Sequence, residues 1–301
     1  MLYRTMTSVN EADIRSVMGT VDSVRTVEGG GFAVRRPFPT EHLAMYDPFL
    51  LLDEMGPADY APGEAVGAPD HPHRGFETVT YMLDGSFQHK DSSGNSGILK
   101  PGAVQWMTAG AGVVHSEMPS EEVMQNGGRL HGFQLWVNLP AAEKMVSPRY
   151  QEFPAEGVPI ASNEAGVWVR VIAGEALGVD AVIDTHTPIM YLHFILQPGA
   201  THVQRVPSEY NAFAYIVEGQ GRFGIDEPED AVEGNLVAFD QDGGQIRVTN
   251  TGDKPLSFLL LGGLPINEQL ARYGPFVMNT EEEIHAAIED YHAGRMGVID
   301  F

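Results

Sequence analysis

The sequence contains no cysteine. Disulfide bonds, thiolate nucleophiles, iron–sulfur clusters and cysteine-bound zinc are therefore excluded, and a metal ion could be held only by histidine, aspartate or glutamate. Long apolar runs are also lacking, because no stretch approaches the roughly 18 residues that a membrane-spanning helix needs. The N-terminal segment from Met1 to Asn10 has no apolar signal-peptide core, so we expect a cytoplasmic protein without membrane contacts.

Basic residues are scarce, with 18 Lys and Arg against 41 Asp and Glu, which gives a formal net charge of −23. Only four of the basic residues are lysines: Lys90, Lys100, Lys144 and Lys254. A strongly negative surface repels phosphate backbones, and no basic stripe offsets it, so direct binding to nucleic acid is not expected. A macromolecular partner, if there is one, should be a protein.

The 301 residues include 34 glycines and 20 prolines that are spread along the chain, a distribution typical of many short strands joined by tight turns. Segment 130–139 illustrates the pattern, because Phe133, Leu135 and Val137 alternate with Gln134 and Trp136. We therefore expect an all-β protein. Its predicted strands lie within residues 21–36 (a hairpin), 47–53, 78–82, 97–108, 130–139, 167–172, 189–196, 212–218, 236–239, 246–250 and 256–261.

Two halves of similar size predict a duplicated β-sandwich, and the similar segments 81–85 and 215–219 occupy matching places in them. The charged, proline-containing segment 140–157 is the expected linker. The predicted domains are an N-terminal extension (1–18), a metal-binding domain (19–145), a metal-free domain (146–278) and a C-terminal helix and tail (279–301).

The tail carries the signals of one amphipathic helix. Thr280 and Glu283 form a capping box, and Gly294 occupies the position at which a helix commonly ends. The apolar residues of the same segment follow helical spacing: Ile284, Ala287, Ile288 and Tyr291.

Two pairs of potential metal ligands stand out, His71 with His73 and His115 with Glu117. Because side chains alternate with a period of two in a strand, each pair projects from one face. Two such strands that faced each other across a barrel would bring four ligands to one point. Three imidazoles and one carboxylate suit Fe, Mn, Ni, Cu or Zn better than Mg or Ca.

Longer blocks around these residues carry a resemblance to a known family. They are His71-Pro72-His73-Arg74-Gly75-Phe76-Glu77-Thr78, residues 105–110, residues 112–119, residues 135–139, residues 174–178 and residues 274–280. Over about residues 20 to 293 the sequence resembles the pirin family. The resemblance implies two tandem cupin barrels with one metal ion, usually iron, in the first barrel only.

The ligands of pirin-family proteins match His71, His73, His115 and Glu117. The resemblance further implies the quercetin 2,3-dioxygenase activity reported for several members. The expected cofactor is Fe(II), with Mn, Ni, Cu or Zn as alternatives, and the expected substrates are a flavonol-like aromatic compound and O2. Glu117 is then also the candidate catalytic base for the substrate hydroxyl.

Three further residues are candidates for supporting roles around the metal. Glu77 shares the parity of His71 and His73, but it lies roughly 13 Å beyond His73 on an ideal strand, so we expect it to support the site rather than bind the ion. Arg74 could orient a carboxylate or an anionic substrate, or pack domains together. His131 matches a family position and either lines the cavity or is a structural histidine.

Other aromatic and sulfur-containing residues are candidates for an apolar cavity wall or for ordinary core: Phe76, Met82, Trp106 and Met107. In the second half Gln204 follows His202 at the place of a second histidine, and no later His-x-Glu pair occurs, so that domain is expected to bind no metal.

These observations lead to three hypotheses about the function of the protein. The first is a metal-dependent dioxygenase, in which the ion acts as a Lewis acid toward a flavonol. The second is a metal- or redox-sensing regulator of transcription or metabolism that acts through protein contacts. The third, a double cupin without a catalytic task, is disfavoured by the four ligands. We expect a monomer.

Overall fold

The computed structural model describes residues 11–301, and β-strands dominate it. The chain forms two compact units, each discontinuous in sequence. Unit 1 comprises the chain up to Asp22, Ile160–Asp180 and Met190–Gly262, and unit 2 comprises Ser23–Pro159, Ala181–Ile189 and Gly263–Phe301. The predicted all-β class is confirmed. No helix among the described residues is both long and apolar enough to cross a membrane.

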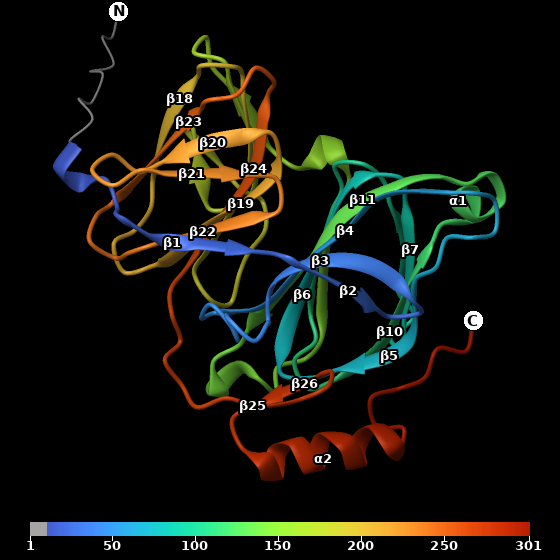
Figure 1. Ribbon diagram of the computed structural model, residues 1–301. Helices are drawn as coiled ribbons and strands as arrows, with labels where there is room; N and C mark the ends of the chain where they lie inside the picture. Colours follow the sequence, from blue (N-terminus) through green and yellow to red (C-terminus); the bar gives the residue numbers. More distant parts are fainter. Residues whose placement is uncertain (1–10) are drawn as a thin grey trace, which may run out of the picture. The chain divides into compact units, whose positions relative to one another are not determined.

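Unit 2 contains the predicted ligands and is built mainly from two sheets (Figure 1). The larger sheet has the strand order β12-β9-β6-β11-β4-β3-β2, and the smaller has the order β5-β10-β7-β8. The elements of this unit are β2 (Val24–Glu28), β3 (Phe32–Phe38), β4 (Phe49–Tyr60), β5 (Ala68–His73), β6 (Phe76–Asp84), β7 (Phe87–Asp91), β8 (Ser96–Leu99), β9 (Val104–Thr108), β10 (Val113–Pro119), α1 (Glu121–Asn126), β11 (Gly128–Asn138), η2 (Ala141–Glu143), β12 (Arg149–Phe153), η3 (Ala155–Gly157), β25 (Ala271–Tyr273), β26 (Phe276–Met278) and α2 (Glu281–His292).

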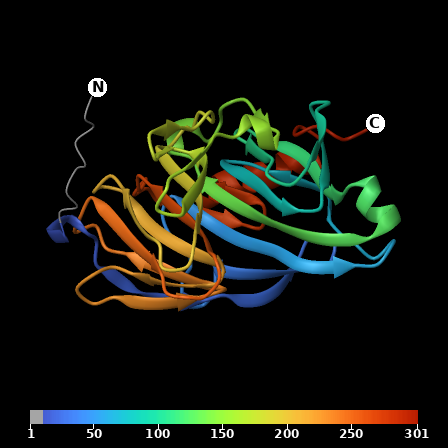
Figure 2. The ribbon, with the colours of Figure 1, turned by 90° about the horizontal axis from the view of Figure 1, so that it is seen from above.

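Unit 1 repeats the two-sheet plan, and Figure 2 shows its strands from a second side. The orders are β1-β22-β19-β24-β17-β14-β13 and β18-β23-β20-β21. Its elements are η1 (Glu11–Asp13), β1 (Val17–Asp22), β13 (Ile160–Ser162), β14 (Val167–Ala173), β15 (Glu175–Ala176), β16 (Val179–Asp180), β17 (Ile189–Leu196), β18 (Thr201–Arg205), β19 (Asn211–Glu218), β20 (Gln220–Phe223), β21 (Glu229–Val232), β22 (Asn235–Phe239), β23 (Gln245–Asn250) and β24 (Leu256–Gly263).

The two units do not follow the predicted domain boundaries. Strand β1, which begins inside the expected N-terminal extension, pairs with β22 of unit 1. The expected linker contains β12, which pairs with β9 and so belongs to unit 2. Segment 263–278 also belongs to unit 2. These pairings join residues far apart in sequence, which local patterns do not reveal. Positions 1–10 of the expected extension lie outside the described residues.

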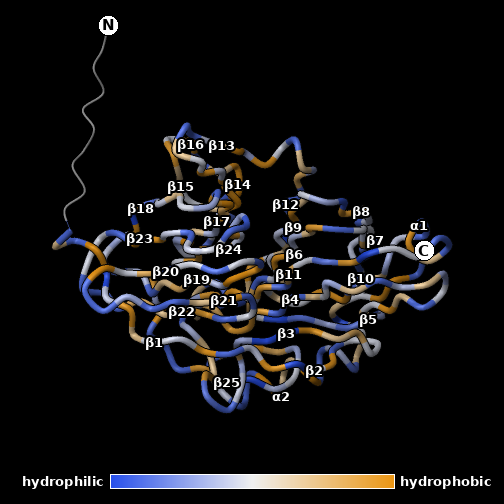
Figure 3. Tube along the Cα trace, turned by 45° about the horizontal axis from the view of Figure 1, so that its top comes forward, coloured by the Kyte–Doolittle hydropathy of each residue, from blue (hydrophilic) through white to orange (hydrophobic). Residues whose placement is uncertain are grey.

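The period-two alternation seen in the sequence is a property of the folded strands, and Figure 3 shows hydrophobic and hydrophilic residues alternating along them. In β11, Phe133, Leu135 and Val137 are buried on one face. Gln134 and Trp136 on the other face line a cavity. Each predicted strand segment overlaps an observed strand, and the two ligand pairs lie on β5 and β10. The strands that fall outside the predicted segments are β7, β12, β13, β15, β16, β18, β20, β21, β25 and β26, and β1 overlaps a predicted segment only at its end.

The predicted C-terminal helix is confirmed as α2. Its capping box forms, because Thr280 Oγ1 accepts from the Glu283 amide and the Glu283 carboxylate accepts from the Thr280 amide. Ile284 and Ala287 are buried in a cluster with residues of β26. Gly294 has a φ of 72°, as expected just beyond a helix end.

Gly75 and Lys144 fix the segment that follows the His71–His73 pair. Gly75 has a φ of 85°, and a Cβ atom there would lie 2.0 Å from the carbonyl oxygen of Val277, so only glycine fits. The ammonium group of Lys144 is buried and donates to the carbonyls of Gly75 and Val277 and to Asn138 Oδ1. This lysine therefore ties the turn after β5 to β26 and to the end of β11.

The buried lysine predicts a stability that depends on pH. Burial lowers the pKa of Lys144 from 10.5 to about 8. Between these values the unfolded chain binds more protons than the folded chain, so the free energy of unfolding should rise with pH, by at most roughly 3 kcal/mol. Urea denaturation at several pH values across this window should show the rise in the wild type and its absence in Lys144→Met. Equal slopes in the two proteins would contradict the assignment.

Candidate metal centre

Strands β5 and β10 bring the three predicted histidine ligands together. The strands are antiparallel neighbours, with His115 directly opposite His71 and Val113 opposite His73. Since His71 and His73 are two residues apart, both rings project from the face that carries His115. Their nitrogen atoms lie within 4.8 Å of one another, and the Nε2 atoms of His71 and His73 are 3.1 Å apart.

This arrangement differs from the expected one in one respect. The two ligand strands do not face each other across a barrel but lie side by side in the four-stranded sheet. Neighbouring antiparallel strands place opposite side chains close together on the same face. Adjacency therefore achieves the convergence that the sequence had suggested would need opposite walls.

The three imidazoles are suited to a transition-metal ion. Burial lowers the pKa of His73 and His115 well below 6.5, and the neighbouring His71 ring lowers both further. Both rings are therefore neutral near pH 7, the form that carries a lone pair for a metal. Neither ring nitrogen of His115 has a hydrogen-bond partner within residues 11–301, although both are buried. Such unpaired groups are costly inside a protein, and coordination would satisfy one of them.

Glu117 lies in the same cavity but outside the close group of histidine nitrogens. A register shift in the β10–β5 ladder occurs between His115 and Glu117. Its carboxylate is held by Thr80 Oγ1 at 2.7 Å and by Gln134 Nε2 at 2.7 Å. The structure thus places the predicted carboxylate beside the histidines as a fixed hydrogen-bond acceptor.

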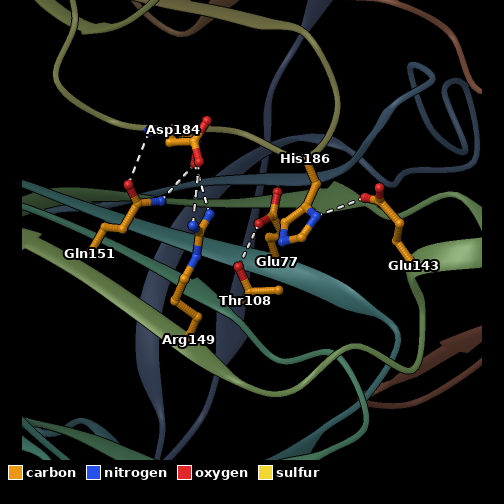
Figure 4. A network of polar contacts seen from close by, with 7 residues as sticks. All are labelled: Glu77, Thr108, Glu143, Arg149, Gln151, Asp184 and His186. Carbon is orange, nitrogen blue, oxygen red and sulfur yellow. Dashed lines mark hydrogen bonds and ion pairs between the residues drawn. The ribbon is translucent and has the colours of Figure 1, made fainter.

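Glu77 is not in the cavity. It lies on β6 directly opposite Thr108 of β9 and accepts a hydrogen bond of 2.7 Å from that hydroxyl. Figure 4 shows its carboxylate beside the ring of His186, in a polar network that also contains Arg149 and Asp184. Thr80, three residues along β6, does line the cavity, and residues three apart on a strand face opposite sides.

Burial makes Glu77 an unusual carboxyl group. Its pKa is raised, chiefly by desolvation, and the hydrogen bond from Thr108 offsets part of the rise. These properties belong to the polar network of Figure 4 and not to the metal centre.

His131 and Arg74 are also absent from the cavity lining. His131 has the parity of Phe133 on β11, opposite to Gln134, and its Nε2 lies 2.8 Å from Glu54 Oε1. The Arg74 side chain points toward α2, where it pairs with Asp290 at 2.7 Å and donates to the Ala111 carbonyl. Each therefore has a structural role in the described fold.

His71 and His73 line a cavity of about 550 Å³ within unit 2, and His115 is buried beside them. That volume is within the range of small-molecule sites. The expected apolar residues do not line it, since Met82, Trp106 and Met107 are core and Phe76 packs behind Trp136 and His73. Its apolar wall consists of other side chains: Phe32, Leu51, Met55, Phe87 and Trp136.

The cavity also has polar residues that sequence reasoning did not single out: Glu28, Arg36, Asp53, Thr80, Gln134 and Arg272. For Gln134 a signal existed, because it alternates with the core residues of β11. Arg36 and Arg272 had none, since they come from β3 and β25, and only the fold brings them to the histidines.

Comparisons with known proteins agree with this fold. The pirin family model matches residues 31–137, and the model of the pirin C-terminal cupin domain matches residues 191–297. A pirin-like protein of Solanum lycopersicum is 47% identical over 90% of this chain and 89% of its own, and pirin of Homo sapiens is 45% identical over 90% of each. A crystal structure of quercetin 2,3-dioxygenase from Acinetobacter baumannii has a TM-score of 0.88 and 36% identity, and the match covers 95% of this chain and 100% of that one. The predicted two-cupin fold is confirmed.

The three-histidine group predicts which substitutions remove a bound ion. Alanine at His73 or His115 should lower the metal content of untagged protein at least about tenfold, since even the loss of an outer-shell partner commonly costs 10–100-fold in affinity. Elemental analysis measures this directly. His202→Ala is the matched control, because His202 lies beside Gln204 in unit 1 at 3.4 Å and should leave the content unchanged. Unchanged metal in the His73 and His115 variants would contradict the assignment.

Proposed function

Because the chain belongs to the pirin family, we propose that it is a metal-dependent dioxygenase that opens the ring of a flavonol such as quercetin with O2. The proposal rests on one observation above all: the neighbouring imidazoles of His71, His73 and His115 lie at a cavity of about 550 Å³, which His71, His73 and the fixed carboxylate of Glu117 line. The similarity to the quercetin 2,3-dioxygenase of Acinetobacter baumannii supports it.

His71, His73 and His115 would hold the ion, with Glu117 as the fourth ligand or as the base beside it. We propose Fe(II), although a set of imidazoles also accepts Mn, Ni, Cu or Zn. When bound, the ion supplies Lewis acidity at the hydroxyl and carbonyl oxygens of the substrate.

Side chains of the cavity would bind the substrate and accept its proton. The apolar wall formed by Phe32, Leu51 and Met55 would hold the aromatic rings and exclude water. Glu117 would take the proton of the flavonol hydroxyl, because an ionised carboxylate only accepts hydrogen bonds. Thr80 and Gln134 keep the carboxylate oriented, because each donates a hydrogen bond to a different one of its oxygens. The overall reaction consumes one O2 and releases carbon monoxide and an ester of two phenolic acids.

Glu117→Gln tests this role. Protein loaded anaerobically with Fe(II) should consume O2 and bleach quercetin, and the amide variant should do so about 10²–10⁴-fold more slowly, because it accepts no proton. O2 uptake, quercetin absorbance and metal content should be measured on the same samples, since a loss of metal would mark Glu117 as a ligand rather than a base.

Glu121→Gln is the control, because Glu121 is exposed on α1 and should behave as the wild type. Full turnover by Glu117→Gln would contradict the role of Glu117. A fully loaded wild type that leaves quercetin unchanged would contradict the dioxygenase itself and favour the regulator that acts through protein contacts.

A further inference from the structure

Arg272 is a cation of the cavity that has no ion-pair partner among the described residues. It lies on β25, which pairs with β26 through the turn at Gly274 and Pro275, and all three of these residues line the cavity. Within the described part of the chain its one hydrogen bond runs from Nη1 to the carbonyl oxygen of Leu50, at 3.2 Å. A guanidinium has five N–H donors, so most of its donor capacity is not used by the protein.

The other arginine of the cavity is in the opposite situation. Arg36 makes a two-point contact with Asp53, at 2.7 and 2.6 Å, and also pairs with Glu28 at 2.7 Å. Both carboxylates are thereby directed at Arg36, and they reach Arg272 only through longer-range attraction. Two further carboxylates line the cavity: Glu117, which is engaged by Thr80 and Gln134, and Asp70, which is exposed to solvent.

The position of Arg272 is fixed relative to the histidines. Its guanidinium lies over the ring of Trp136, 4.8 Å from the ring centroid. Trp136 in turn contacts His73, with ring centroids 5.2 Å apart. Stacking on an aromatic face holds a guanidinium in place while its edge remains available to a planar anion. Burial and the nearby Arg36 lower the pKa of Arg272, and the more distant carboxylates of Glu28 and Asp53 offset part of that lowering.

We propose that Arg272 binds a carboxylate of the substrate, so that the cavity is built for an aromatic hydroxycarboxylate rather than for an uncharged flavonol. The carboxylate would contact the guanidinium edge, and the hydroxyl end of the same molecule would reach the His71, His73 and His115 centre. This inference rests on the proposed function, since it takes that centre as the place where the hydroxyl binds. Quercetin would then be a substitute that fills the apolar wall but leaves Arg272 without an anion.

Binding measurements separate this inference from the question of turnover. The probes are protocatechuate and its uncharged carboxamide, which keep the same ring and hydroxyls and differ only in the charge that Arg272 would meet. Titration calorimetry with protein loaded with Zn(II), which has no redox chemistry, should give a carboxylate affinity about tenfold to a hundredfold above that of the amide. The same ratio should persist in metal-free protein, with both probes bound more weakly.

Variants identify the residue responsible. Arg272→Gln should abolish the preference for the carboxylate while leaving amide affinity and metal content unchanged, and Arg272→Lys should restore part of the preference. Arg129→Gln is the control, since Arg129 is a half-exposed arginine of β11 outside the cavity lining. A wild type that binds both probes equally, or an Arg272→Gln protein that keeps the preference, would overturn the inference. Failure to consume O2 with quercetin would contradict the flavonol substrate of the proposed function and would leave this binding result standing.

Discussion

The register between β5 and β10 is the constraint on which the site depends. This register sets His115 directly opposite His71. His73, two residues further along β5, projects from the same face of the sheet. A slip of one residue would turn either the pair on β5 or the ring on β10 to the other face. Gly67 helps to fix this register, because a Cβ atom there would lie 2.4 Å from the carbonyl oxygen of Glu117. The strands can approach closely at that point only because the side chain is absent.

The interior polar groups divide into those that satisfy one another and those that do not. Glu117 is satisfied by Thr80 and Gln134, and Asp53 by Arg36. The nitrogens of His115 have no hydrogen-bond partner in the part of the chain that the structure describes. A buried polar group without a partner typically costs about 1–3 kcal/mol, so a fold that keeps such groups at one point gains when a ligand reaches it. A metal ion bound at His115 would recover part of that cost.

Local sequence patterns predicted the parts of this site that lie within single strands. The alternation of β11 and the spacing of His71 with His73 were readable because a strand repeats every two residues. The boundaries of the two units could not be predicted from local sequence patterns, because β1 and β12 join their sheets by pairing with strands that are distant in sequence. The place of Arg272 in the cavity could not be predicted for the same reason. Its neighbour Trp136 lies more than a hundred positions earlier in the chain, and no periodicity connects the two residues.

Glu77 shows where counting by parity stops being valid. Its odd number matches His71 and His73, but β5 ends at His73 and β6 begins at Phe76 in a different sheet. Gly75, with its positive φ, turns the chain between the two, so the face reached by odd residues before the turn is unrelated to the face reached after it. Within β6 parity holds again and puts Thr80 in the cavity and Glu77 outside it. The side-chain period therefore assigns faces within one strand, and cross-strand register is needed to say which face is the interior.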